Sequence, residues 1–184
     1  YMRKKWGAYI PVRIRGGHGP SDFANVLRGN ELFYDIYDEP EELQELLKFC
    51  TKAVHFNLDL QRAQATEIAG GYVSGFSLWM PGKCIGHLGE DLSTMLSPEN
   101  YEEHFLPALK ECYSDCDMGM LHTHTLGARM LPLFAGIDNI QILEISNDPN
   151  SYPELAQEYG VWDVPKTYLH LLEDNPIEIN YDIP

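Results

Sequence analysis

The strongest constraint on the fold comes from residues 117–149, which read DMGMLHTHTLGARMLPLFAGIDNIQILEISNDP. The hydrophobic pattern predicts a strand over Met118–His122, a helical stretch over Leu126–Ala135 and a second strand over Ile140–Ile145. A strand, a helix and a strand in succession are typical of a βαβ unit, in which the two strands run parallel. The segment therefore favours an α/β fold.

Two histidines lie where the first of these strands ends. His122 and His124 are two positions apart, and residues so spaced in an extended segment point to the same face. Because two imidazoles can reach one ion at roughly 2.0–2.1 Å, the pair is a candidate metal site. Glu144 and Asp148, on and after the next strand, could add a carboxylate ligand or orient an imidazole. Polar residues that only cap the strand ends are the alternative interpretation.

The same alternation continues along the rest of the chain. Ser21 is expected to cap a short helix, and Ser97 followed by Pro98 is expected to start another. The alternation predicts a parallel α/β architecture for residues 1–184, taken as a single domain. Further strands are predicted over residues 10–15, 72–80 and 177–183, and further helices over residues 21–28, 40–69, 98–112, 153–159 and 165–172. The helix that starts at residue 40 either runs on to Ala69 or breaks near Phe56–Leu58.

The number of predicted strands leaves two architectures open. About five or six strands are too few for a closed eight-stranded barrel, which takes roughly 250 residues. The chain is then either the central part of a TIM-type (β/α)8 barrel or an open doubly wound sheet. Its first residues, Tyr1-Met2-Arg3, are unusual for a natural start, so we expect a piece of a longer protein.

Charge and composition exclude several classes of function. The net charge of −15 argues against binding nucleic acid through phosphates and against attraction to an anionic membrane surface. The four cysteines are too sparse for a disulfide framework. No apolar run approaches the roughly 18 residues of a membrane span and no signal-peptide pattern is present, so a cytoplasmic protein is expected. Motifs of dehydrogenases, kinases and serine or cysteine hydrolases are missing.

Basic residues in the N-terminal part indicate a place for an anionic ligand. Arg13 and Arg15 share one face of the strand predicted there, and arginine binds a carboxylate in bidentate fashion. His18 lies in the glycine-rich loop that follows, where glycines permit close approach of the backbone to a ligand. Further along, His87 and Asp91 form a candidate pair of general base and orienting acid. A purely structural role is the alternative for each group.

Several stretches, taken in order, resemble the uroporphyrinogen decarboxylase superfamily. The stretch VRIRGGHGPSDFANVLRGNELFYDIYDEPEELQELL resembles a strand, loop and helix start of that superfamily. The stretch GHLGEDLSTMLSPENYEEHFLPALK resembles its strand end followed by a Ser-Pro-Glu helix, and LHTHTLG and IQILEISNDP resemble the next two strands. The resemblance covers nearly the whole chain and implies a (β/α)8 barrel, of which this chain would be the middle part.

The resemblance implies one of two activities. The methyltransferase branch of the superfamily uses zinc to hold and deprotonate a thiol, through ligands in a His-x-Cys pattern at a strand end. Here His122 matches that pattern, whereas His124 stands at the position of the cysteine. The decarboxylase branch uses no cofactor and holds a multiply carboxylated tetrapyrrole through arginines and an aspartate. Its substrate-contacting tyrosine has no clear match, because Phe23 and Ala24 stand near that place.

We therefore expect an enzyme of this superfamily, either a methyltransferase that acts through a metal-activated thiol or a uroporphyrinogen decarboxylase. A non-catalytic binding or interaction module is a third interpretation. The expected partners are a small-molecule substrate, a corrinoid protein and a second copy in a homodimer. The expected site residues are His122 and His124 as ligands of zinc, His87 and Asp91 as catalytic residues, and Arg13, Arg15, His18 and Asp148 as substrate contacts.

Overall fold

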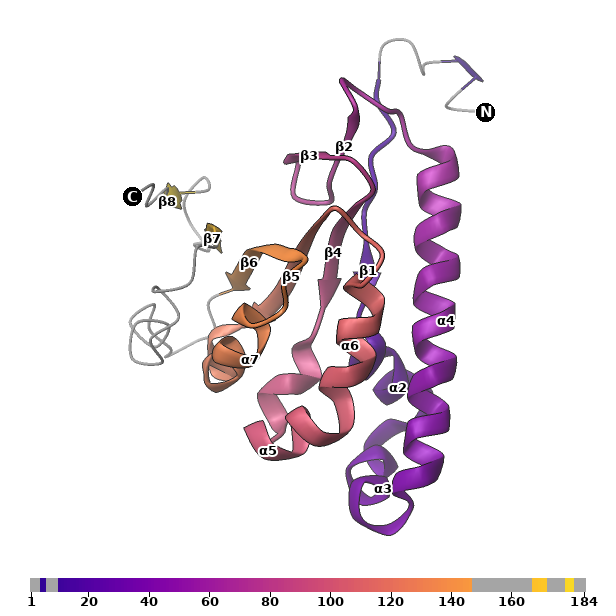
Figure 1. The fold of residues 1–184 in the computed structure, drawn as a ribbon, viewed down its shortest axis with the longest axis vertical. Coiled ribbons are helices and arrows are strands. Elements are labelled where there is room, and N and C mark those ends of the chain that lie inside the picture. The colour runs from indigo at the N-terminus through magenta and orange to yellow at the C-terminus, as the bar shows by residue number, and fades with distance from the viewer. Residues whose placement is uncertain (1–3, 6–9, 147–166, 172–177, 181–184) are drawn as a thin grey trace.

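The computed structural model of the chain describes residues 4–5, 10–146, 167–171 and 178–180. Within these residues, parallel strands alternate with helices (Figure 1), which confirms the predicted α/β class. None of the described helices has both the length and the apolar character needed to cross a membrane.

The described strands form a central six-stranded sheet with the order β1-β4-β5-β6-β7-β8. Neighbouring strands pair in parallel except for β7 and β8, which are antiparallel. The register sets Gly89, His122 and Glu144 side by side across three strands. The bounds are β1 (Gly17–His18), β4 (Cys84–Gly89), β5 (Met118–His124), β6 (Ile140–Ser146), β7 (Thr167–Leu171) and β8 (Glu178–Asn180).

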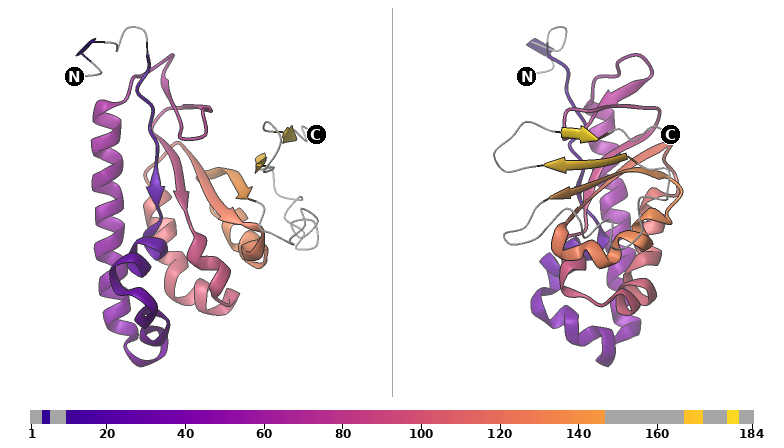
Figure 2. Two further views of the ribbon diagram at one scale, coloured as in Figure 1. Left: turned by 180° about the vertical axis from the view of Figure 1, so that it is seen from behind. Right: turned by 90° about the vertical axis from the view of Figure 1, so that its left-hand side faces the viewer.

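Helices pack on one face of this sheet, and Figure 2 shows the longest of them, α4, along the edge of the molecule. Ile85, Leu121 and Leu143 point from three strands into one core with the apolar stripes of the helices. The helices are α2 (Pro20–Arg28), α3 (Leu32–Asp38), α4 (Pro40–Gln64), α5 (Pro98–Asn100), α6 (Leu106–Tyr113) and α7 (Leu131–Ala135). Shorter turns are 3-10 helical at Gly29–Glu31, Asp91–Met95 and Thr125–Met130 and π-helical at Tyr101–Phe105.

The opposite face of the sheet carries an antiparallel hairpin of β2 (Gly71–Val73) and β3 (Trp79–Pro81). Met80 of the hairpin joins Met120 of β5 and Ile142 of β6 in a second, smaller apolar cluster. Because successive strand residues alternate between faces, His122 and His124 lie on the same face as Met120. The histidines therefore point away from the helical layer.

Two predictions in the N-terminal half are wrong. The single strand predicted over residues 72–80 is the hairpin, because the chain reverses where the amide of Ser74 bonds to the carbonyl of Leu78. The strand predicted over residues 10–15 is displaced. Ile14 makes only an isolated bridge with Ser74, and regular pairing with β4 begins at Gly17.

The predictions near the C-terminus have mixed outcomes. The helix predicted over residues 165–172 is wrong where the structure describes it, because β7 pairs there with β6. The strand predicted over residues 177–183 is confirmed at β8. The helix predicted over residues 153–159 lies outside the described residues.

Of the two predicted serine caps at helix starts, one is confirmed and one is wrong. Ser97 caps its helix as predicted, since its Oγ accepts a hydrogen bond of 3.2 Å from the amide of Asn100. Ser21 does not cap α2, because Pro20 already opens this helix and Gly19 is the N-cap. α4 is one continuous helix that ends at Gln64, earlier than predicted, because the next residue is extended.

Two glycines let the N-terminal loop lie directly against β4. A Cβ atom at Gly16 would fall 2.0 Å from the carbonyl oxygen of His87, and one at Gly19 would fall 1.9 Å from Oε1 of Glu90. Gly16 also has a φ of 86°, a conformation that other residues rarely adopt. Gly16 and Gly19 are therefore required by close packing, the first against the backbone of β4 and the second against the side chain of Glu90.

The Gly19→Ala variant is expected to lower the free energy of unfolding by about 2–3 kcal/mol, because its methyl group would overlap the buried carboxyl group of Glu90. Denaturant titration measures this change. Gly136→Ala is the matched control, since Gly136 has a φ of −76° and the nearest atom to its Cβ would lie 3.4 Å away. Equal effects of the two substitutions would contradict the packing argument.

Candidate functional site

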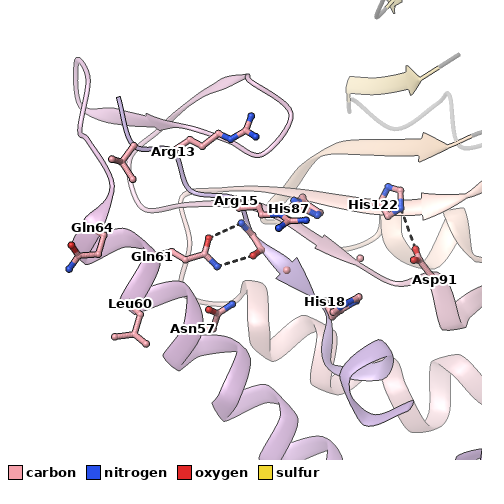
Figure 3. A pocket seen from close by; sticks show the side chains of 14 residues that line it. Arg13, Arg15, His18, Asn57, Leu60, Gln61, Gln64, His87, Asp91 and His122 are labelled. Atoms are coloured by element: carbon pink, nitrogen blue, oxygen red, sulfur yellow. Dashed lines mark hydrogen bonds and ion pairs between the residues drawn. The ribbon is translucent and has the colours of Figure 1, made fainter. Parts of the chain in front are cut away.

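A pocket of about 790 Å³ lies beside the carboxyl ends of β1, β4 and β5 (Figure 3). Functional side chains of α/β folds gather at the carboxyl ends of the parallel strands, because the loops that follow the strands meet there. The polar lining residues come from the segment before β1, from α4 and from the strand ends: Arg13, Arg15, His18, Asn57, Gln61, Gln64, His87, Asp91 and His122.

Three potential metal ligands lie close together, and two of them, Asp91 and His122, line this pocket. Oδ1 of Asp91 lies 3.3 Å from Nε2 of His122 and 3.5 Å from Nε2 of His124. One ligand atom from each of the three residues lies within 4.8 Å of the others. The imidazole rings of the two histidines are 5.1 Å apart, which confirms the prediction that they share a face. Asp91, predicted as the partner of His87, pairs instead with both histidines of β5.

His122 is held between two carboxylates. Its Nδ1 bonds to Oε2 of Glu144, a residue with no exposed surface, and Oε1 of Glu144 accepts a hydrogen bond of 3.0 Å from Ser146. Burial by itself would lower the pKa of His122, but the hydrogen bonds to Asp91 and Glu144 outweigh it and raise the pKa to about 10. The two carboxylates therefore favour a positive charge at this position, whether a proton or a metal cation supplies it.

Asp91 is positioned by a buried carboxylate that the sequence did not single out. Oδ2 of Asp22 accepts the backbone N–H of Asp91 at 3.1 Å, and Oδ1 accepts that of Leu92 at 2.7 Å. These N–H groups open the 3-10 turn Asp91–Met95 and have no partner within it. Asp22 thus fixes the start of the turn, and with it the side chain that faces the histidines. In the sequence, only the place of Asp22 shortly after the glycine-rich loop 16–20 could have indicated this positioning role.

A second buried acid joins the loop to the end of β4. Oε2 of Glu90 accepts hydrogen bonds from the hydroxyl groups of Ser21 and Tyr101. Complete burial, together with the nearby charge of Asp22, raises the pKa of Glu90 to about 8. A largely protonated Glu90 at neutral pH avoids a buried negative charge beside Asp22. Glu90 therefore connects α2 with the end of β4 through buried hydrogen bonds and does not line the pocket.

His87 lies on the pocket wall with an aromatic neighbour. Phe76, at the tip of the hairpin, contacts His87 edge-on at 5.1 Å and stacks on His122 at 6.2 Å between ring centroids. Burial lowers the pKa of His87, so the imidazole is neutral at neutral pH. Its Nδ1 is buried and has no hydrogen-bond partner among the described residues. A neutral imidazole in the pocket suits the predicted role of a general base.

The residues predicted to contact substrate fall in one pocket where the structure describes them. Arg13 and Arg15 are both exposed on either side of the buried Ile14, and both line the pocket with His18 (Figure 3). Arg13 also donates a hydrogen bond of 3.1 Å to the carbonyl oxygen of Gly75 in the hairpin. Asp148 lies outside the described residues.

Gln61 of α4 is a pocket residue that the sequence did not indicate. Its side-chain amide accepts the N–H of Gly16 at 3.0 Å and donates to the carbonyl oxygen of the same residue at 2.8 Å (Figure 3). Gln61 thus satisfies both polar groups of the backbone just before the edge strand β1, where no neighbouring strand is described. A glutamine on a long amphipathic helix carries no sequence signal for such a role.

Comparisons of the chain with protein-family models, with curated proteins and with solved structures found no match. The chemistry of the site is therefore inferred from its residues. They combine two imidazoles and a carboxylate at metal-ligand spacing, a neutral histidine and two arginines around one pocket.

The Asp22→Ala variant is expected to lower the free energy of unfolding by about 2–4 kcal/mol, because it leaves two backbone N–H groups without their acceptor. Asp22→Asn keeps one acceptor oxygen and should cost less than half as much. Urea titration compares both with Asp38→Ala, which removes an exposed acid and should stay within about 0.5 kcal/mol of the parent. A loss after Asp22→Ala no larger than that of the control would exclude the capping role.

Proposed function

We propose that Asp91, His122 and His124 bind a divalent metal ion, most simply zinc, and that the chain is part of an enzyme acting on a small molecule in the adjoining pocket. The observation that carries this proposal is the convergence of three ligand atoms from two strand ends within 4.8 Å. The set combines two imidazoles with one carboxylate, which is a common donor set of catalytic zinc and leaves a position for substrate.

The distances between the ligand atoms fit this proposal. Two ligand atoms bound tetrahedrally at roughly 2.0–2.1 Å from zinc lie about 3.3 Å apart. The distances from Oδ1 of Asp91 to the two histidine nitrogens, 3.3 and 3.5 Å, are close to this value. A cation at Nε2 of His122 would also balance negative charge at this ring, since the carboxylates of Asp91 and Glu144 contact its two nitrogens.

Each neighbouring residue has a defined part in this proposal. Glu144 accepts a hydrogen bond from Nδ1–H of His122 and so leaves the lone pair of Nε2 directed towards Asp91, as carboxylates behind metal-ligating histidines do. Asp22 holds the turn that presents Asp91. Zinc bound there would lower the pKa of a thiol or water and supply a nucleophile at neutral pH. His87, neutral and on the pocket wall, can take up a proton from the substrate.

The resemblance noted in the sequence narrows the proposal to methyl transfer. In the uroporphyrinogen decarboxylase superfamily the methyltransferase branch holds a thiol on zinc at the strand end that matches His122. The strands β1, β4, β5, β6 and β7 pair in parallel and in chain order, which is the order of a singly wound barrel. We therefore propose that they are part of a TIM-type barrel and that a corrinoid protein supplies or accepts the methyl group.

The second candidate is decarboxylation without a metal, and the arginines favour it. Arg13 and Arg15 line the pocket with exposed guanidinium groups that can grip carboxylates of a substrate. In this alternative His122, with its raised pKa, would be a cation between Asp91 and Glu144. The two candidates differ in whether a metal is needed.

The metal content of the purified chain separates the candidates. We expect about one zinc per chain by elemental analysis after dialysis, and loss of at least about nine-tenths of it in the His122→Ala/His124→Ala double variant. His55→Ala is the matched control, since His55 is a half-buried histidine on α4 away from the cluster. It should retain the full metal content.

A folded parent chain that binds no zinc, cobalt or manganese would refute the metal site. Tight binding of a porphyrinogen analogue by that metal-free chain would then favour the decarboxylase. If neither metal nor analogue binds, that outcome favours a fragment or a non-catalytic interaction module.

The Glu144→Gln variant tests the orienting role. It should bind zinc about 10- to 100-fold more weakly than the parent, because the charge-assisted hydrogen bond that sets the tautomer of His122 is lost. Competition with a chromophoric chelator measures the affinity. Glu103→Gln, an exposed carboxylate near His104, is the control and should leave the affinity unchanged. An unchanged affinity in Glu144→Gln would show that Glu144 does not orient the ligand.

A further inference from the structure

α4 has a second apolar stripe that faces away from its own core. Phe49, Phe56 and Leu60 are 58%, 65% and 53% exposed, although each is a large apolar side chain. Both Figure 1 and Figure 2 place α4 at the outer edge of the molecule, with no described element on its outer side. These three side chains are separate from the core-facing residues of the helix, which are Leu43, Leu47, Cys50, Thr51, Val54 and Leu58. Leu46, one turn before Phe49, is half-buried and packs against the edge of the core.

The spacing of this stripe is that of a helix–helix contact. Its apolar positions alternate in steps of three and four residues: Leu46, Phe49, Ala53, Phe56, Leu60 and Ala63. Such a repeat lines up the seam of two helices that pack at about 20°. From the first to the last of these positions the helix runs roughly 26 Å at 1.5 Å per residue. Core packing alone does not explain a repeat on the exposed side.

We propose that this stripe pairs antiparallel with the same stripe of a second copy of the chain. An antiparallel pair with its two-fold axis between positions 54 and 55 places each alanine of the stripe opposite a large side chain. Ala53 meets the partner's Phe56, and Leu46 meets the partner's Ala63. Phe49 meets the partner's Leu60. A parallel pair would instead stack each residue on its own copy, with phenylalanine on phenylalanine and alanine on alanine.

The charges beside the stripe also favour the antiparallel pair. Lys52 and Asp59 flank the same side of the seam, and both are exposed. In the antiparallel register Lys52 lies about two residues along the axis from the partner's Asp59, and symmetry repeats this opposite-charge pair. In a parallel pair Lys52 would flank the partner's Asn57, and neither charge would find an opposite one. Asp59 already bonds to Arg62 at 2.8 Å, but its carboxylate is 71% exposed and open to a second cation.

The pairing would reach the pocket. Leu60 belongs to the stripe and also lines the pocket, next to Asn57 and Gln64 on the adjoining flank of α4. The second helix would therefore lie along the outer rim of the pocket. This inference does not depend on the metal site, because it rests on the outer face of α4 alone.

Sedimentation equilibrium of the whole chain at fixed ionic strength tests the pairing. We expect a dimer for the parent chain and a dimer dissociation constant at least about 30-fold higher for Phe56→Glu, which places a charge in the centre of the seam. Val26→Glu is the matched control, since Val26 is 67% exposed on α2 and lies off the stripe. It should dimerise like the parent, and circular dichroism checks that every variant is folded.

A charge swap tests the antiparallel register. Lys52→Glu and Asp59→Lys should each weaken the dimer several-fold, and the double variant should restore it, because the two charges exchange places across the seam. A monomeric parent chain, as would be found if another segment of a longer protein covers the stripe, overturns the proposal. A dimer that survives Phe56→Glu, or single variants that the double variant does not rescue, also overturns it.

Discussion

The arrangement of the site depends on the buried pairing of Glu144 with His122. Glu144 has no exposed surface, and a carboxylate in that position needs an opposite charge or several hydrogen bonds. His122 provides the charge through Nδ1, and Ser146 adds a hydrogen bond. Because this pairing uses Nδ1, the other ring nitrogen is left to face Asp91. The placement of His122 beside Asp91 thus follows from charge compensation at the buried Glu144.

The position of Asp91 depends in turn on close packing between the N-terminal loop and β4. Glycines at positions 16 and 19 allow backbone to lie against strand, and this brings α2 near the end of β4. Asp22 then reaches the first amides of the turn that carries Asp91. The buried side chain of Glu90 is accommodated because two hydroxyl groups donate hydrogen bonds to it and because burial raises its pKa to about 8. Loop, turn and strand end therefore form one polar unit around the pocket.

Local patterns were sufficient where the relevant contact lies within the element itself. The start of the helix after Ser97 follows from capping, and the strands β5 and β6 follow from their apolar runs. Patterns failed where long-range pairing decides the conformation. The pattern predicts single strands over residues 10–15 and 72–80. The first segment makes only an isolated bridge, and regular pairing begins at Gly17, whereas the second segment folds back on itself as a hairpin. Alternating apolar residues do not encode which backbone will be available to pair with them.

The sequence by itself determined the α/β class and the common face of His122 and His124, because both depend on periodicity along a few residues. It also placed Arg13 and Arg15 on one side of their segment. Only the tertiary structure decided that Asp91 belongs with these histidines rather than with His87, and that Glu144 and Asp22 support them. The residues involved are 22 to 69 positions apart, and the parallel register and the connections between strands bring them together.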